Sequence, residues 1–514
     1  MIKSFKSSTL VAAMKKMLTP SQSGSEDPIT PEEIGNGSVT ENPRATGSDS
    51  SSYAHGTRTV GTFEVVLQVI DELFRSSKST SQFGKLDNLK SDIEAAEMSE
   101  PVVSPANAFN PKTDSLHSSM RPIIMLAQCF SMFPVSGVNT PDASHLRFTW
   151  RSPKFIYCAI SFLGSSTMTI FNIMRIITSG INSTRMTTFV FNGTNLIAAF
   201  LFLKLAMQWP CLMATWEKLE KELSNRHKKV SRTTLAAKFK IVTMVVMIFA
   251  LVEHSFSILH GYIKAKDCAQ SRGDPDIIGV YFQSQFPQIF SRIPYSLWKG
   301  IVVDIINILS TFSWNFVDIF LILISIALVD QFRQLNSRLY SIRGKAMPEW
   351  WWAEARSDYN HLATLTRQLD SHISIMVLLS FATDLYFICI QLLFSFNPMR
   401  SIVEKIYFGF SFGFLLARTT VVSLCAASIH DESLLPAPIL YSVSGSSYST
   451  EVMRFLSQVT TDSICLTGMK FFSVTRSLVL TVAGTIVTYE LVLVQFNAVQ
   501  QNGASNSTDV CEVK

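Results

Sequence analysis

Long apolar blocks alternate with polar and basic segments from residue 155 onward. Seven of these blocks approach or exceed the roughly 20 residues that an α-helix needs to cross the hydrocarbon core of a bilayer. The second block contains Pro210, which predicts a kink. We therefore predict seven transmembrane helices, over residues 155–177, 186–216, 241–263, 298–329, 373–399, 402–429 and 473–496.

The beginning of the chain follows a different pattern. Residues 19–56 are rich in Ser, Thr, Gly, Pro and Glu, which bury too little apolar surface to offset the entropy lost on folding. We expect residues 1–116 to be cytoplasmic and largely disordered, apart from an amphipathic helix near 62–76, where apolar residues recur at intervals of three and four. Residues 122–138 are apolar but interrupted by Pro134, and we predict a re-entrant or interfacial helix over residues 117–138, before the first span.

Composition excludes an ordinary soluble enzyme. Of the 514 residues, 47% are hydrophobic and only 16% are charged, with a mean hydropathy of +0.25, whereas soluble domains carry about 25% charged residues. The sequence has no phosphate-binding Gly-Lys-Ser/Thr loop and no His-Glu-x-x-His, and its cysteines lack metal-ligand spacing. We expect a multi-pass plasma-membrane protein with no enzymatic activity, no cofactor, no metal and no nucleic-acid partner.

The distribution of basic residues predicts the orientation. Lys and Arg are concentrated in the loop between the second and third spans and in the loop between the fourth and fifth. Cytoplasmic loops carry this excess, so we predict a cytoplasmic N-terminus and an extracellular C-terminus. The glycosylation sequons at Asn182 and Asn506 then lie outside. Cys268 and Cys511 also lie outside, either as a disulfide or as two single thiols.

This topology divides the rest of the chain into four parts. Residues 139–430 form a six-helix ligand-binding bundle, 431–472 a cytoplasmic loop with an oligomerisation region, 473–497 a pore helix and 498–514 an extracellular tail. We expect His430, Asp431 and Glu432 to lie at an exposed loop edge. The fold class is thus an all-α polytopic membrane protein, inverted relative to G-protein-coupled receptors.

Charged and polar side chains inside the spans mark the candidate site. A charge at the bilayer centre costs about 2.5 to 3.5 kcal/mol, so it usually faces a partner, a pore or a water-filled cavity. Carboxylates accept sugar hydroxyls, amides donate to them, and aromatic faces pack on the sugar ring. We predict a sugar site built from Asp304, Asp384, Trp298, Asn307, Trp314, Tyr386, Gln391, Tyr407, His260 and Glu253.

Two alternatives to this site remain open. The polar groups could instead bond one another between helices, as they do in many membrane bundles. Arg418 is expected either to pair with a carboxylate, for which Asp318 is one candidate, or to extend to the cytoplasmic edge.

The last span has a distinct pattern. Thr481, Thr485 and Thr488 recur at three- and four-residue spacing along one face, with Tyr489 and Gln495 nearby. A face lined by hydroxyls predicts a wet pore, and one helix cannot enclose a pore, so the pattern implies a symmetric oligomer.

The segment from Thr488 to Phe496, TYELVLVQF, resembles the Thr-Tyr to Gln-Phe signature that ends insect gustatory receptors, and its Glu490 is similar to the sugar-receptor branch. Residues 127–135 and 381–393 also resemble that branch, and the similarity covers about residues 122–497. It implies a channel for cations, gated by mono- or disaccharides, in the membrane of a chemosensory neuron. It also implies a homotetramer or a hetero-oligomer with related receptors, in which Thr488 and Tyr489 position the pore helix and Gln495 and Phe496 form the gate.

Two other functions would suit a seven-helix chain. A receptor coupled to G proteins would need an extracellular N-terminus, and the sixth span lacks the Trp-x-Pro typical of that class. A sugar transporter would show saturable uptake with little current.

Overall fold

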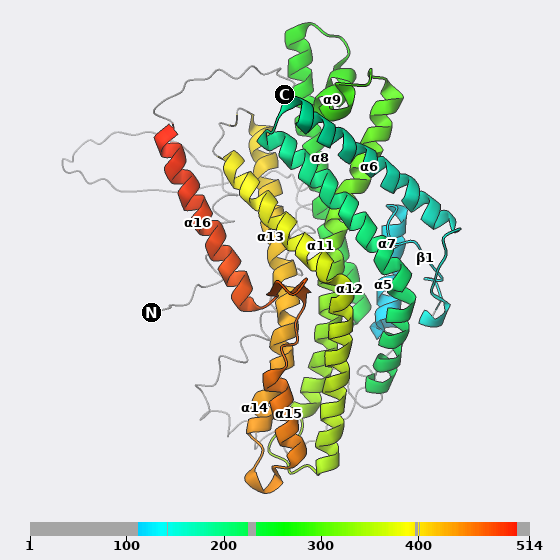
Figure 1. Cartoon of the computed structure of the whole chain (residues 1–514), viewed down its shortest axis with the longest axis vertical. Helices are drawn as coiled ribbons and strands as arrows, with labels where there is room; N and C mark the ends of the chain where they lie inside the picture. The colour runs from blue at the N-terminus through cyan, green and yellow to red at the C-terminus, as the bar shows by residue number, and fades with distance from the viewer. Residues whose placement is uncertain (1–110, 141, 225–232, 396–398, 400, 501–514) are drawn as a thin grey trace, which may run out of the picture. The chain divides into compact units, whose positions relative to one another are not determined.

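The structure is a computed structural model that describes residues 111–140, 142–224, 233–395, 399 and 401–500 (Figure 1). The predicted amphipathic helix near 62–76 and the tail with Asn506 and Cys511 lie outside these residues. Helices dominate the described part, with two short antiparallel hairpins. The elements are α4 Pro111–Asp114, α5 Leu116–Cys129, β1 Val135–Ser136, η3 Ala143–His145, β2 Arg147–Phe148, α6 Pro153–Ser179, α7 Ser183–Ser224, α8 Leu235–Arg272, α9 Ile277–Gln285, α10 Pro287–Phe290, α11 Leu297–Tyr340, α12 Glu349–Ser395, α13 Ile402–Leu434, α14 Pro436–Tyr441, η4 Gly445–Ser447, α15 Thr450–Thr461, β3 Thr467–Gly468, β4 Phe472–Ser473 and α16 Arg476–Gln500.

Six helical stretches are long and apolar enough to cross a membrane. They are α6, α7, α8, α11, α12 and the continuous stretch from α13 into α14. Each matches one of the first six predicted spans, except that α12 ends at Ser395, before the predicted end of the fifth span at residue 399. Helix α7 continues through Pro210. The chain is therefore an all-helical, multi-pass membrane protein. The last predicted span coincides with α16, whose described apolar part, Arg476–Ile486, is shorter. The seventh crossing and the orientation of the termini remain predictions.

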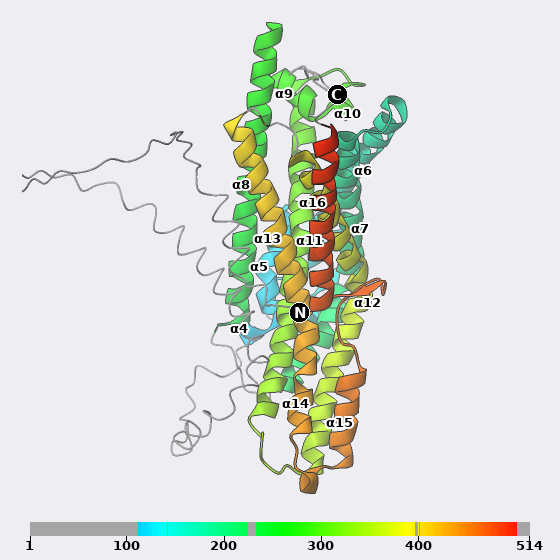
Figure 2. The ribbon, with the colours of Figure 1, turned by 90° about the vertical axis from the view of Figure 1, so that its left-hand side faces the viewer.

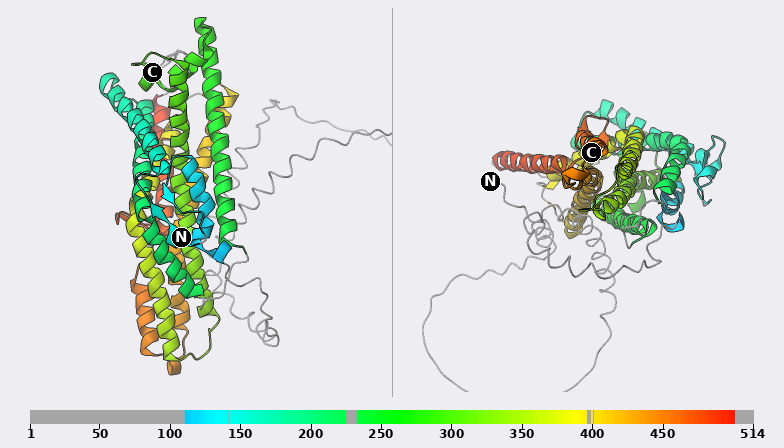
Figure 3. Two further views of the ribbon diagram at one scale, coloured as in Figure 1. Left: turned by 90° about the vertical axis from the view of Figure 1, so that its right-hand side faces the viewer. Right: turned by 90° about the horizontal axis from the view of Figure 1, so that it is seen from below.

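Helix α11 forms the core of the bundle. It contacts α7, α8, α12 and α13, and it runs between them (Figures 2 and 3). Of its most apolar stretch, 94% is buried, against 17% for α6, whose isoleucines face outward. At 44 residues α11 is about 66 Å long, roughly twice the thickness of the hydrocarbon core. The helix therefore extends well beyond the bilayer, and so does α12.

Polar residues at the helix ends fix where the long helices start and stop. The side chains of Ser152 and Thr234 accept hydrogen bonds from Phe155 and Ala237 in the first turns of α6 and α8. Helix α8 ends at Gly273, whose φ of 68° is the left-handed conformation that glycine adopts without strain.

The segment before the first span differs from its prediction. Helix α5 ends at Cys129 instead of continuing to Val138, and the chain then turns into the β1–β2 hairpin. The helix is not at an exposed interface: Leu116, Met120 and Ala127 are buried, and α5 packs against α7 and α8. The backbone N–H of Leu116 donates to the buried carboxyl group of Glu220 on α7. This hydrogen bond holds the start of the helix in the protein interior.

The residues after the sixth span also differ from their prediction. His430, Asp431 and Glu432 belong to the last turns of α13, not to a loop edge. Glu432 is buried, and its carboxylate accepts hydrogen bonds from Arg333 (2.8 Å) and Asn336 (3.1 Å) of α11. The prediction failed because α13 continues beyond its apolar stretch and packs on the longer helix α11.

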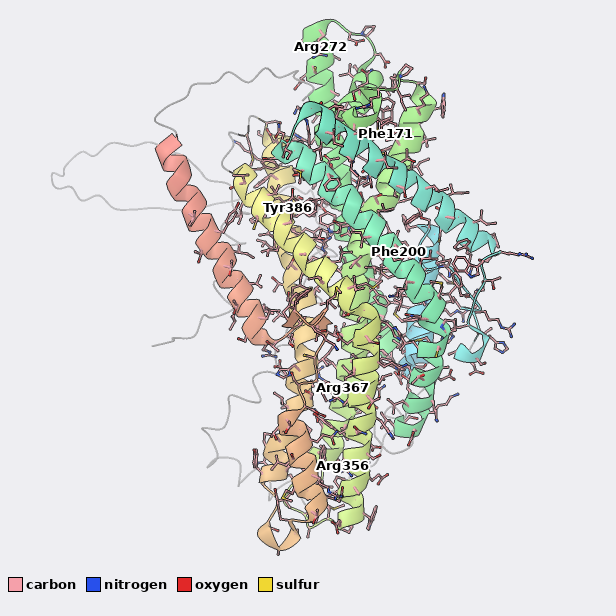
Figure 4. All side chains as sticks on the ribbon, viewed as in Figure 1. Phe171, Phe200, Arg272, Arg356, Arg367 and Tyr386 are labelled. Atoms are coloured by element: carbon pink, nitrogen blue, oxygen red, sulfur yellow. The ribbon has the colours of Figure 1, made fainter. Side chains whose placement is uncertain are left out.

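The two ends of the bundle differ in composition. Arg356 and Arg367, labelled in Figure 4, lie in the lower half of α12, where α15 packs against that helix, whereas Arg272 ends α8 at the opposite end. The α11–α12 connection is at the lower end (Figure 1). Arg356 and Arg367, which belong to the basic excess that predicts the cytoplasmic side, therefore lie at the end of the bundle that holds α15.

Candidate functional site

A buried arginine connects three helices at the centre of the bundle. Arg418 of α13 is 3% exposed. Its Nε lies 2.7 Å from Asp318 Oδ2 on α11, and its Nη2 lies 3.2 Å from Asp384 Oδ1 on α12. The prediction that Arg418 pairs with a carboxylate is confirmed, with Asp318 as one of its partners. Asp384, a predicted sugar ligand, is the other.

Further groups complete this Arg418 network. Arg418 Nη1 donates to Asn315 Oδ1 (2.6 Å), and its guanidinium carbon lies 4.3 Å from the centre of the Trp314 ring. The second oxygens of the two carboxylates accept from Ser380 (2.6 Å, to Asp318) and Thr419 (2.8 Å, to Asp384). The desolvated charges are thus compensated by opposite charges, hydrogen bonds and an aromatic face.

A second polar group lies between α8, α12 and α13. The hydroxyl of Ser411 donates to Glu253 Oε1 and accepts a hydrogen bond from Gln391 Nε2 (3.3 Å). Ser411 and Gln391 lie two helical turns from Arg418 and Asp384 on the same helices. The structure therefore brings two predicted sugar ligands together through a serine, and stacks them above the Arg418 network.

Aromatic residues adjoin this group. The rings of His260 on α8 and Tyr407 on α13 stack with their centres 5.6 Å apart and 17° between their planes. The hydroxyl of Tyr386, labelled on α12 in Figure 4, is buried and makes no hydrogen bond within the described residues. A buried polar atom without a partner is costly, so Tyr386 is suited to bond a ligand or water.

The predicted ligands on the outer part of α11 are in different surroundings. Asp304 is half-buried, close enough to His254 of α8 and Tyr281 of α9 for electrostatic interaction. Trp298 is 66% exposed in the first turn of α11, with Lys299 Nζ 5.7 Å from the centre of its ring. Asn307 is half-buried, and its backbone carbonyl accepts a hydrogen bond from the Thr311 hydroxyl. The predicted sugar residues thus fall into separate groups.

The candidate pore residues lie on α16. Thr488 and Tyr489 are exposed, and Gln495 and Phe496 belong to the helix but their side chains are outside the described part. Asn182 is exposed between α6 and α7, as glycosylation requires. Cys268 is buried in α8.

Sequence reasoning missed the neutral residues that join the charged ones. Ser380 and Thr419 cap the carboxylates, and Ser411 bridges Glu253 and Gln391. Ser380 lies one helical turn from Asp384 and Thr419 one residue from Arg418, whereas Ser411 lies two turns from Arg418 and carries no such sequence signal. A small pocket next to Asp318 is lined by Thr194, Asn195 and Trp314, among others. Within the described residues, no group of three or more His, Cys, Asp or Glu side chains is suited to hold a metal ion.

Similar proteins identify this architecture. The insect olfactory receptor OR5 from Machilis hrabei superposes with a TM-score of 0.54 at 13% identity, over 74% of this chain and 98% of that one. It therefore shares the fold. At the level of sequence, the chain is 36% identical over 412 residues to the gustatory receptor 5a for trehalose of Drosophila melanogaster, covering 80% of this chain and 91% of that one.

A second relative and a family model also match this chain over most of its length. The gustatory receptor for sugar taste 64f of Drosophila melanogaster is 37% identical over 384 residues, 74% of this chain and 81% of that receptor. The model of the trehalose receptor family matches residues 78–508. The chain therefore belongs to the trehalose receptor family, as a relative of the gustatory receptors for sugar taste.

Proposed function

We propose that this receptor is a sugar-gated, non-selective cation channel of the plasma membrane of chemosensory neurons. A mono- or disaccharide binds in the outward-facing part of the six-helix bundle, and α16 helices from four copies, or from this chain and related receptors, surround the pore. The single observation that carries the proposal is the exposed hydroxyl face of α16.

That face is unusual for a helix in a membrane bundle. Thr481, Thr485 and Thr488 are all exposed in the single chain, although α16 contacts α12 and α13 and Ile486 packs against the cluster of Phe387 and Leu415. Hydroxyls gain nothing from contact with lipid tails, whereas they suit a water-filled lumen. A lumen needs several helices around an axis, which supports an oligomer of this chain.

The hydrogen bonds of these threonines favour cations. Each hydroxyl donates its proton to the carbonyl four residues earlier: Thr481 to Ser477, Thr485 to Thr481 and Thr488 to Gly484, all at 2.9 Å. Each oxygen keeps lone pairs and has no proton to offer outward. A pore lined by such oxygens presents acceptors only, which stabilise partly hydrated cations and not anions.

The sugar site that the geometry supports best lies between α8, α12 and α13. Glu253, Gln391, Tyr386 and the His260–Tyr407 stack supply acceptors, donors and aromatic faces within one region of the bundle. Asp384 and Trp314 support this site from below through Arg418. Asp304, Trp298 and Asn307 would contact a sugar on its way in, near α9.

Gating requires that sugar binds the open arrangement more tightly than the closed one. A ligand that bridges α8, α12 and α13 has this property if opening changes the distances between those helices. Asp384→Ala should accordingly shift sugar potency without changing the conductance of a single channel.

The test is an outside-out patch recording from cells that express this chain alone, with sugars applied and no GTP in the pipette. A rapid current carried by cations supports the proposal. A response that needs GTP would favour a G-protein-coupled receptor, and saturable sugar uptake without current would favour a transporter. Surface labelling of the chain is the control for expression.

A further inference from the structure

A carboxylate of α12 binds the hairpin that leads from the bundle into α16. Asp370 of α12 accepts two hydrogen bonds from Thr467 at the start of the β3–β4 hairpin: Oδ1 from the backbone N–H (2.7 Å) and Oδ2 from the side-chain hydroxyl (2.8 Å). Hydrogen bonds to a charged acceptor are about twice as strong as neutral ones. We call the contact between Asp370 and Thr467 the hairpin latch.

The hairpin itself is compact. Thr467 pairs with Ser473 and Gly468 with Phe472, and the turn holds Met469 and Lys470 at φ values of 51° and 62°. Two successive non-glycine residues in the left-handed region are strained, and such turns persist where their surroundings hold them in place. The hairpin latch is such a constraint, because it fixes the strand that enters the turn.

The far strand leads directly into α16. The Phe472 ring lies 5.6 Å from the Phe381 ring of α12, Val474 is fully buried, and Arg476, the first residue of α16, pairs with Asp431 of α13. Only a short segment therefore separates the hairpin latch from the first turn of α16. A displacement of Thr467 must shift the base of that helix.

Helix α12 joins the latch to the site. It runs from Glu349 to Ser395 without a glycine or a proline, so nothing in its sequence introduces a hinge. Asp370 lies about 21 Å along the axis from Asp384, at 1.5 Å per residue. The helix is continuous between the two positions, although it changes direction between Tyr386 and Arg367 (Figure 4), so a shift of α12 at the sugar site is transmitted along the helix to Asp370.

We infer that Asp370 is a positioning residue for gating: through Thr467 it transmits the movement of α12 to the base of the pore helix, and it stays bonded in both the closed and the open state. This inference rests on the proposed function. Asp370 contacts neither the sugar nor the pore, so its loss should separate binding from opening.

The first test uses Asp370→Ala and Thr467→Val. Both should reduce the maximal sugar-evoked current or raise the half-maximal sugar concentration by at least about fivefold, the lower end of a typical allosteric coupling. Binding of radiolabelled sugar and single-channel conductance should stay unchanged. Asp370→Asn should restore much of the response, because its amide oxygen still accepts from the Thr467 N–H.

The matched control is Arg367→Ala. Arg367 lies one turn before Asp370 on α12 and pairs with Asp462, at the end of α15, not with the hairpin. A current equally reduced in this control would indicate general damage to α12 and would overturn the latch. An unchanged sugar-evoked current in Asp370→Ala would also overturn the latch. The coupling would then be assigned to Ile486 of α16, which packs against Phe387 and Leu415.

The second test locks the latch with a disulfide, whose formation is measured separately from the current. Asp370→Cys combined with Thr467→Cys, in a Cys465→Ser background, should form a disulfide on mild oxidation. The oxidised receptor should still open with sugar, because the latch stays closed during gating. Absence of the disulfide, or a response blocked until a reductant is added, would overturn the inference. If the disulfide forms in the double-cysteine variant but the wild-type chain is silent to every sugar despite surface expression, the result would instead contradict the proposed function.

Discussion

Arg418 Nε lies 2.7 Å from Asp318 Oδ2, and each side chain is 2% exposed or less. This contact joins α13 to α11 in the interior of a membrane bundle, with Asp384 as a second anion. The cation is therefore what allows two carboxylates to be buried side by side.

Removing that cation should destabilise the receptor severely. Arg418→Met leaves two carboxylates without their counter-charge, which costs about 3 to 5 kcal/mol. Thermal unfolding in detergent should show a large fall in melting temperature. Adding Asp318→Asn and Asp384→Asn to the Arg418→Met variant should recover much of the lost melting temperature. The control is Lys221→Ala, which removes a largely exposed partner of Glu217 and should cost less than about 1 kcal/mol. Equal melting temperatures for the two single variants would contradict the prediction.

The stacked rings of His260 and Tyr407 give a test of the sugar site. Tyr407→Ala removes an aromatic face and a hydroxyl, and we expect sugar potency to fall about tenfold, the equivalent of about 1.4 kcal/mol of binding free energy. Concentration–response curves measure this change. Tyr262→Ala is a suitable control, because Tyr262 is 44% exposed two residues from His260. A fall in single-channel conductance would instead place Tyr407 in the permeation path.

The threonine face of α16 predicts the behaviour of the pore. Thr485→Val removes an acceptor oxygen from that face, so we expect a lower single-channel conductance with little change in sugar potency. Thr420→Val is the matched control, because Thr420 is an exposed threonine on α13 with the same bond to the carbonyl four residues earlier. Equal conductance in the two variants would exclude Thr485 from the pore.

Gln495 gives a separate test of the gate. Gln495→Ala should change conductance or produce a sugar-independent leak, and should affect sugar potency less. Recordings with and without sugar distinguish the two effects. A normal conductance combined with a large shift in potency would argue against a gate at this position.

The lower end of the bundle should respond to acid through Glu451. Hydrogen bonds from Arg356 and Arg454, both 2.8 Å long, hold the pKa of Glu451 below its usual range. The ionised Glu451 therefore stabilises the folded protein at pH values above about 4.3, the pKa of a Glu side chain in the unfolded chain. This stabilisation is lost as the pH falls through the lower pKa that Glu451 has in the folded protein. Between pH 7 and about pH 3, the melting temperature should therefore fall more in the wild type than in Glu451→Gln. If the melting temperatures of the wild type and of Glu451→Gln fall equally with pH, Glu451 does not stabilise the folded protein in this way.

Hydropathy predicted the helices well, because the bilayer requires about 20 apolar residues for each crossing wherever the helix packs. It could not give their full length. Helices α11 and α12 continue through polar residues such as Asn336 and Asp358, which are buried only because long helices pack on each other outside the bilayer. For the same reason Glu432 was assigned to a loop.

The candidate site was predictable by residue type but not by partner. Sequence spacing shows that Asp384 and Arg418 lie inside spans, but the rotation and depth of two helices decide whether they meet. The residue types therefore predict a sugar ligand at Asp384 but not its contact with Arg418. The periodicity of α5 likewise does not reveal whether its apolar face meets lipid or protein.

The Arg418 network has an electrical consequence. Its cation lies on α13 and its two acidic groups lie on α11 and α12, all buried where the transmembrane field falls. Moving one elementary charge through the whole of that field changes the energy by about 2.3 kcal/mol per 100 mV. If α13 moves along the membrane normal relative to α11 during opening, Arg418 moves relative to Asp318 within that field, so the resting potential of the cell sets part of its sensitivity to sugar.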